Sequence, residues 1–337
     1  MLFLIMGRTV FVPLVFALFF SILLYPLNKI LERRMHLGRM LAALFTVLIF
    51  ITCLSLFIYF FTNQIASFAA DYPELKKRIV GMIGDLQQWF SKEFHVNVRQ
   101  QTDYINKSTA GIIGTLANSV SDIFLSFASF SIWLVFMFFY IFFILFYRKL
   151  LLRFVLSLFQ DHHGPKVYEV VTETRTMVYS YILGLLIEMV IVGTINCTIF
   201  SIMGIKYALF LGVLAAVFNI IPYIGIYSAT VLVMLVTVAN STGSHALWAG
   251  FALLMVHFVD ANIMMPRIVG ARVKMNAFIT IIAVILGNFT WGIAGMFLFI
   301  PITGILKIVS ERVDGMQPWA ILIGDDAKEE KVKKKAG

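Results

Sequence analysis

The chain has 337 residues, of which 60% are hydrophobic and 13% are charged, and a formal net charge of +9. An ordinary soluble domain carries about 25% charged residues, so a soluble fold could not bury this much apolar surface. The apolar runs are continuous rather than alternating, which indicates membrane helices and not a transmembrane barrel. Lys and Arg flank these runs, so the positive charge indicates membrane topology and argues against a nucleic-acid partner.

Apolar runs of two kinds follow one another along the chain. Five are close to the ~20 residues that cross a ~30 Å hydrocarbon core: residues 9–27, 40–62, 124–147, 179–203 and 246–265. Two more are interrupted: residues 207–239 by the stretch Asn219 to Gly225, and residues 276–309 by Gly287-Asn288 and Trp291-Gly292. Each interrupted region is either a pair of short full spans or a re-entrant hairpin. We therefore predict an all-α polytopic membrane protein with five secure spans, two broken or re-entrant helical hairpins and an extramembrane helical arm.

The basic clusters orient these spans. The positive-inside rule places the loop after the first span, with Arg33, Arg34 and Arg39, in the cytoplasm. Counting spans from there puts residues 63–123 outside and the Lys-rich carboxyl tail inside. The localisation expected is the prokaryotic inner membrane, with a cytoplasmic tail.

A span followed by a broken hairpin occurs twice, at 179–239 and at 246–309, in opposite orientations. Inverted repeats of this kind place the substrate site of secondary transporters near the membrane midplane. The alternative is that Pro and Gly only kink ordinary spans, which membrane helices tolerate.

The chain divides into five parts on this reading. They are the amino-terminal spans 1–62, the extramembrane helical arm 63–123, the third span with its cytoplasmic connector 124–178, the transport core with two broken hairpins 179–312, and the cytoplasmic tail 313–337. The arm carries apolar residues at helical spacing from Ile65 to Trp89, with Pro73 marking a helix start or a kink. This stripe packs either against a later helix bearing Ile112 and Leu116 or against a neighbouring subunit.

Ionisable groups within membrane spans are costly and are therefore candidate functional residues. Glu188 lies in the fourth span, and His257 and Asp260 lie in the fifth. Asp260 is the strongest candidate for ion coupling because it stands beside Asn262 and just before Pro266-Arg267. The structural alternative is that Asp260 only pairs with Arg267 or Arg272.

Polar and helix-breaking residues at the two interruptions are further pathway candidates. Asn219, Pro222 and Gly225 belong to the first break, and Asn288 and Gly292 to the second. Backbone groups freed at such breaks are natural ligands for polar substrates or cations. Asn196 offers another amide at membrane depth. Motifs of zinc hydrolases, P-loop ATPases and serine hydrolases are absent, so we expect no enzyme, no cofactor and no metal site.

The motifs between residues 204 and 301 resemble the autoinducer-2 exporter family. They are Gly204-Ile205-Lys206-Tyr207-Ala208, the stretch from Asn219 to Gly225, Asp260-Ala261-Asn262, Pro266-Arg267-Ile268-Val269-Gly270, Trp291-Gly292-Ile293-Ala294-Gly295-Met296 and Pro301. The resemblance implies a homo-oligomer, in particular a pentamer, with re-entrant hairpins and a helical arm. Two features depart from the family: an additional amino-terminal span is missing or shortened, and Asp260 stands where Glu is more usual.

The function expected is therefore a secondary transporter or exporter of a small polar solute. The resemblance implies an autoinducer-2-like signal for some members of the family and proton or sodium exchange for others. A cation/proton antiporter, a passive channel and a non-transporting oligomeric membrane scaffold are the alternatives that the sequence leaves open.

Overall fold

The computed structural model describes residues 6–94, 131–159, 164–222, 224–265, 267–268 and 275–324. Within these ranges every regular element is a helix, and six helices are long and apolar enough to cross a membrane. The prediction of an all-α polytopic membrane protein is confirmed.

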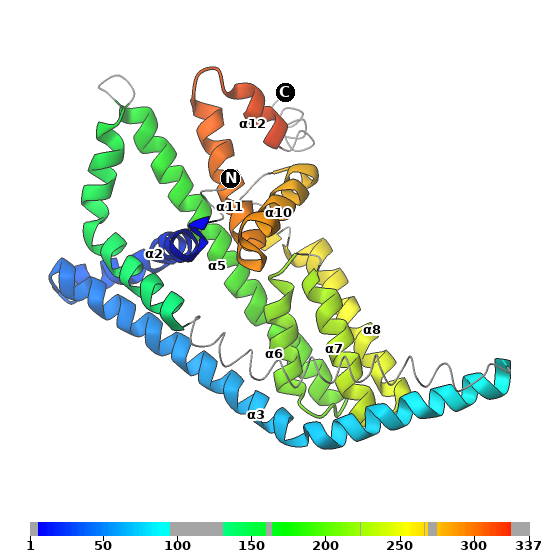
Figure 1. Ribbon diagram of the computed structural model, residues 1–337. Helices are drawn as coiled ribbons and strands as arrows, with labels where there is room; N and C mark the ends of the chain where they lie inside the picture. The colour runs from blue at the N-terminus through cyan, green and yellow to red at the C-terminus, as the bar shows by residue number, and fades with distance from the viewer. Residues whose placement is uncertain are drawn as a thin grey trace.

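The helices follow the chain in the order shown in Figure 1. They are α2 (Arg8–Arg34), α3 (Arg39–Phe94), an unlabelled helix at Ser131–Ser157, α5 (Gly164–Ile202), α6 (Ala208–Asn219), α7 (Ile224–Asn240), α8 (Gly243–Val259), the π-helical turn η1 (Asp260–Met264), α10 (Ala277–Trp291), α11 (Ile293–Arg312) and α12 (Gln317–Ile323). The six candidate spans comprise the five expected ones and α11.

Helix α5 contacts helices from both parts of the structure: α2, α6, α8 and α11. Its 39 residues extend for ~58 Å, well beyond a ~30 Å hydrocarbon core. Its first half packs against α2 and α11, where Val178 and Leu298 are buried, and its second half packs against α6, α7 and α8 around Phe200. A residue in the middle of α5 therefore lies where the two groups of helices meet.

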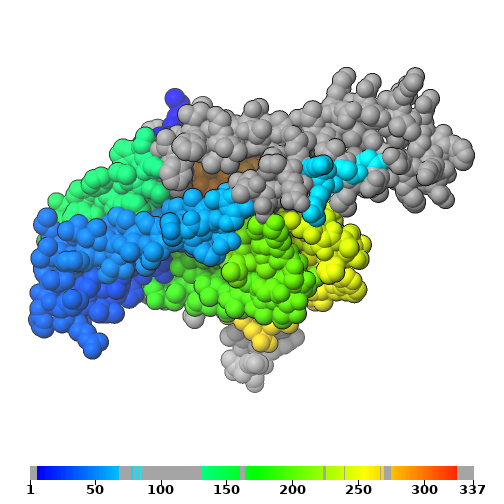
Figure 2. All heavy atoms as spheres, turned by 90° about the horizontal axis from the view of Figure 1, so that it is seen from below, coloured from blue at the N-terminus to red at the C-terminus, as the bar shows by residue number. Residues whose placement is uncertain are grey.

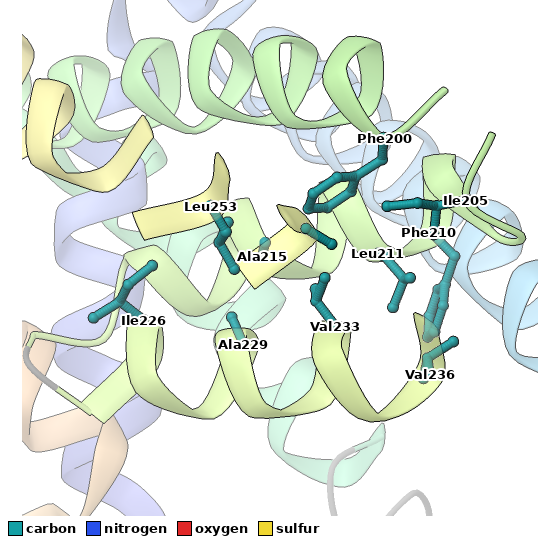
Figure 3. Packing of buried hydrophobic residues seen from close by; sticks show 11 residues of the cluster. Phe200, Ile205, Phe210, Leu211, Ala215, Ile226, Ala229, Val233, Val236 and Leu253 are labelled. Atoms are coloured by element: carbon teal, nitrogen blue, oxygen red, sulfur yellow. The ribbon is translucent and has the colours of Figure 1, made fainter. Parts of the chain in front are cut away.

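The first broken hairpin is formed by α6 and α7. Helix α6 has 12 residues and extends for only ~18 Å, which is too short to cross the hydrocarbon core. This length favours the re-entrant hairpin over the pair of short full spans. Figure 3 shows the apolar side chains that hold it against α5 and α8, among them Leu211 from α6, Val233 from α7 and Leu253 from α8.

The break of this hairpin lies where the sequence predicts it, between Asn219 and Ile224. A Cβ atom at Gly225 would lie 1.7 Å from the carbonyl oxygen of Phe218, a distance that no side chain can occupy. Glycine is therefore required for the first turn of α7 to pass this close to the end of α6.

The second broken hairpin is formed by α10 and α11. Only one of the two expected interruptions is a break: α10 continues through Gly287-Asn288 and ends at Trp291, and Gly292 makes the turn at φ 62°. Gly287 instead lets the two helices touch, because a Cβ atom there would lie 2.3 Å from the carbonyl oxygen of Gly295.

Helix α3 is a single element of 56 residues that runs from the span into the predicted arm without interruption at residue 63. It changes direction along its length (Figure 1), as expected for a helix with Pro73 in its interior. Figure 2 shows α3 alongside the first hairpin, where the rings of Phe61 and Phe210 have centroids 6.0 Å apart. Most side chains of the predicted stripe, and residues 95–130 that could face it, lie outside the described residues.

Ion pairs and a cation–π contact bring the basic helix ends together on one side of the structure. Arg148 pairs with Glu32, the guanidinium of Arg175 lies 3.7 Å from the centroid of the Tyr25 ring, and Arg312 pairs with Glu169. The carboxyl-terminal parts of α2 and α11 therefore contact the first part of α5, and the helix Ser131–Ser157 is joined to the end of α2. These are the ends that the positive-inside rule assigns to the cytoplasm.

This arrangement predicts where single cysteines are accessible. With Cys53 and Cys197 replaced by alanine, a cysteine at Ser241, after α7, and one at Asp314, after α11, should react with a membrane-impermeant maleimide from opposite faces of right-side-out and inverted vesicles. Reaction of both from the same face would contradict the topology.

Candidate functional site

Four polar side chains meet near the middle of α5. The amide nitrogen of Asn219, the last residue of α6, donates to Asp260 Oδ2 at 2.7 Å and to Glu188 Oε1 at 3.4 Å. The amide oxygen of Asn219 lies 3.1 Å from His257 Nδ1. One asparagine thus links two carboxyl groups and an imidazole, contributed by α5, α8 and η1. We call Glu188, Asn219, His257 and Asp260 the polar cluster.

The geometry assigns the protons in this cluster. An amide nitrogen only donates and an amide oxygen only accepts, so His257 carries its proton on Nδ1 when Asn219 donates to the carboxyl groups. Both carboxyl groups share one donor group, which is too little to satisfy two carboxylates.

Burial makes this shortage costly. Asp260 is 1% exposed and Glu188 is 5% exposed. One oxygen of each, Asp260 Oδ1 and Glu188 Oε2, is buried with no hydrogen-bond partner among the described residues. A buried carboxylate without a partner is strongly unfavourable and is relieved by a proton or a cation. The polar cluster therefore has the chemistry of a site for a proton or a small cation.

The local structure of the chain explains how each side chain reaches the cluster. Helix α6 stops at Asn219, and the turn that follows is closed by the amides of Ile220 and Ile221 on carbonyls of α6. Pro222 has no amide hydrogen and cannot extend the helix. Asn219 is consequently at the tip of the hairpin, deep in the helix assembly.

Asp260 owes its position to a change of helix type. Helix α8 gives way to the π-helical turn η1 at this residue, and such turns are rare and frequent at functional sites. Asp260 is the buried residue of η1, whereas Asn262 is exposed and its amide donates to the carbonyl of Phe258 in its own helix.

The hydrogen bonds described for the polar cluster do not involve the other predicted site residues. Asn288 is an exposed residue of α10 and Gly292 is the turn of the second hairpin. Arg267 is exposed, and Asp260 bonds to Asn219 rather than to this arginine. Pro266 and Arg272 lie outside the described residues. The first hairpin thus contributes directly to the cluster, through Asn219.

Asn196 is a buried polar residue to which sequence reasoning gave little weight. It lies about two turns after Glu188 on α5, is 1% exposed, and neither its amide nitrogen nor its amide oxygen has a partner in the described part of the chain. Its signal in the sequence is an asparagine inside an otherwise apolar run. A water or a polar solute would satisfy both atoms.

The broken hairpin, the buried carboxyl groups and the six candidate spans define a polytopic helical membrane protein with a polar site inside its helix assembly. The sequence profile described as AI-2E family transporter matches residues 1–315. The chain belongs to this family, and it is a multi-pass membrane transporter.

Relatives from two bacteria cover most of the chain. Putative transport protein YrrI of Bacillus subtilis (strain 168) is 26% identical over 317 residues, or 90% of this chain and 86% of that protein. Putative transport protein YhhT of Escherichia coli (strain K12) is 24% identical, over 94% of this chain and 88% of that protein. AI-2 transport protein TqsA of the same strain is 23% identical, over 95% of this chain and 91% of that protein.

The polar cluster predicts how Asn219 contributes to stability. Asn219→Leu removes the donor shared by Glu188 and Asp260, and each unsatisfied buried group costs about 1–3 kcal/mol. We expect thermal unfolding in detergent to shift to clearly lower temperature. Asn262→Leu is the matched control because the side chain of Asn262 is exposed and bonds only within its own helix. Equal unfolding temperatures for the two variants would contradict the role of Asn219.

Proposed function

We propose that this transporter is a secondary exporter of a small polar solute of the autoinducer-2 type, driven by exchange with a proton or a sodium ion. Its site is the polar cluster, with Glu188 and Asp260 as the coupling carboxyl groups. The observation that carries the proposal is the pair of buried carboxyl groups that share one donor at the tip of a broken hairpin.

The solute class in this proposal comes from two sources. The family resemblance implies a furanosyl signalling molecule for some members, and the relative TqsA is named an AI-2 transport protein. A small, uncharged polyol of this kind would be recognised by hydrogen bonds, which Asn196, Asn219 and His257 can supply.

The coupling in this proposal comes from charge. One oxygen of each carboxyl group is buried without a hydrogen-bond partner among the described residues, and a proton or a cation would supply that partner. Release of that ion leaves two negative charges around Asn219, which favours rearrangement of the hairpin tip. Ion occupancy and hairpin position are then linked, as exchange requires.

The membrane and the assembly belong to the same proposal. We place the protein in the prokaryotic inner membrane with its carboxyl tail in the cytoplasm, as the basic helix ends favour. We also propose a homo-oligomer, a pentamer by resemblance. The 27 residues of α3 after Ser67 extend for ~40 Å, which is long enough to reach a neighbouring subunit.

A cation/proton antiporter is the second candidate function. The same observation favours it, because a pair of buried carboxyl groups can exchange ions without any organic solute. The two functions differ in whether ion flux across the membrane requires the solute.

Flux measurements in proteoliposomes test the coupling. We expect Asp260→Asn and Glu188→Gln each to lower the exchange of a radiolabelled autoinducer-2-type furanosyl probe by about tenfold or more and to flatten its pH dependence, because the exchangeable carboxyl group is gone. Glu169→Gln is the control, since Glu169 is 65% exposed and lies near the start of α5, far along the helix from Glu188.

The outcomes separate the hypotheses. If both variants keep the parent's rate and pH profile, neither carboxyl group couples transport. If a pH gradient drives sodium flux through the parent protein in the absence of the probe, and the probe itself is not transported, the protein is a cation/proton antiporter and not an exporter.

A further inference from the structure

The short helix α12 folds back along the end of α11. Helix α11 ends at Arg312, and Gly315, at φ 87°, reverses the chain before α12 begins. Figure 1 shows α12 descending from this turn toward the start of α10. Helix α12 is therefore held beside the hairpin instead of extending away from it.

Asn276 bonds to the end of α12 with both its side chain and its backbone amide. The amide nitrogen of Asn276 donates to the carbonyl oxygens of Leu322 at 2.7 Å and Gly324 at 2.9 Å. The backbone amide of Asn276 donates to the carbonyl of Ile323 at 3.1 Å. The last carbonyls of a helix otherwise have no partner, so Asn276 caps the carboxyl end of α12.

The same side chain also begins α10. Asn276 is the N-cap residue of α10, and its amide oxygen accepts from the backbone amide of Ile279 at 2.8 Å. The amide nitrogen of Asn276 thus holds the end of α12, and its amide oxygen holds the start of α10. The two helix ends are joined through this one side chain.

The attachment also sets the depth of α12 relative to the spans. From the turn at Gly292, α11 extends for 20 residues and α10 for 15, or ~30 Å and ~22 Å. The start of α10 is therefore several Å below the level of Arg312. Arg312 itself pairs with Glu169 and Glu173, near the start of α5. Charged side chains of this kind are expected at the level of the polar headgroups. Helix α12, bonded to Asn276, lies between the level of Arg312 and the level at which α10 starts.

Helix α12 exposes large apolar side chains at this level. Trp319 is 59% exposed, Ile321 66% and Leu322 50%, whereas Ile323 is buried. Next to the attachment, α10 continues an exposed apolar stripe with Phe278 at 67%, followed by Ile281, Ile285 and Phe289. Helix α12 thus carries exposed apolar side chains close to the start of the exposed apolar stripe of α10, and Trp is enriched at the boundary of the bilayer.

We propose that α12 is an interfacial anchor: Trp319, Ile321 and Leu322 insert into the headgroup–acyl boundary of the bilayer, and Asn276 transmits this position to the base of the α10–α11 hairpin. The ligand is the lipid surface of the protein's own leaflet. The anchor holds the base of the second hairpin at a fixed depth while the tip of the first hairpin carries the polar cluster.

Spin labels in proteoliposomes test the anchor. On a background without Cys53 and Cys197, nitroxides attached at residues 321 and 322 should collide more often with oxygen than with a water-soluble nickel chelate, at a depth about 5–10 Å below the phosphates. A label at Gln317, which precedes the apolar residues of α12, should show the opposite preference. Labels at 321 and 322 that are accessible to the nickel chelate would overturn the proposal. Labels shielded from both reagents would also overturn it, because they would place a second copy of the chain on this surface.

A variant pair at Asn276 tests the transmission. Asn276→Asp keeps the oxygen that caps α10 but loses the amide hydrogens that hold Leu322 and Gly324, whereas Asn276→Gln keeps both groups on a longer stem. We expect the label at residue 322 to become mobile and to leave its depth in Asn276→Asp, with α10 still helical. An unchanged depth in Asn276→Asp would contradict the link between α12 and the hairpin. Both readouts are independent of solute flux, so they stand or fall separately from the proposed function.

Discussion

A carboxyl group buried among membrane helices must be satisfied by the protein itself, and the arrangement of the polar cluster follows from that constraint. Water is absent from the hydrocarbon core, so a partner has to be brought to Glu188 and Asp260 by the fold. Asn219 is that partner. It can reach both groups because α6 ends after 12 residues and presents its last residue at the tip of a hairpin.

The break in the hairpin leaves backbone carbonyls without helical partners, and it also positions Asn219 at the polar cluster. Ending α6 inside the membrane frees backbone carbonyls, which the turn at Ile220 and Ile221 partly satisfies. Gly225 lets α7 return at once, because only a residue without a Cβ atom fits against the carbonyl of Phe218. The compact turn keeps Asn219 within hydrogen-bonding distance of η1 and of α5. A longer or looser turn would leave the two carboxyl groups without their common donor.

Glu188 lies on α5 between two groups of packed helices. On one side of this residue α5 packs against α2 and α11, and on the other side it packs against α6, α7 and α8. The polar cluster therefore lies where the two groups of helices meet. The second hairpin is held differently: close contact between Gly287 and Gly295 fixes its arms, and Asn276 fixes its base. One hairpin carries the polar cluster, and the other has the character of a support.

The sequence was sufficient for the spans and for the break after Asn219. It also placed Glu188 and Asp260 within spans, because an ionisable residue within a long apolar run is a strong local signal. The sequence did not predict which of these residues contact one another. The bond between Asn219 and Asp260 joins residues 41 positions apart, and it depends on how α8 packs and on the π-helical turn that directs Asp260 inward. The reading of Gly287 as a break was wrong for a similar reason, since a glycine that permits close helix packing and one that ends a helix look alike in sequence.

Chemical modification of the carboxyl groups is the most direct test of the claim that Glu188 and Asp260 form a buried site for an exchangeable proton. An apolar carbodiimide reacts with protonated carboxyl groups in apolar surroundings, and peptide mass spectrometry locates the adduct. The account predicts modification at Glu188 or Asp260 in proteoliposomes, because both carboxyl groups are buried and one oxygen of each has no hydrogen-bond partner among the described residues. Modification confined to exposed carboxyl groups such as Glu169, with none at Glu188 or Asp260 at any pH, would contradict it.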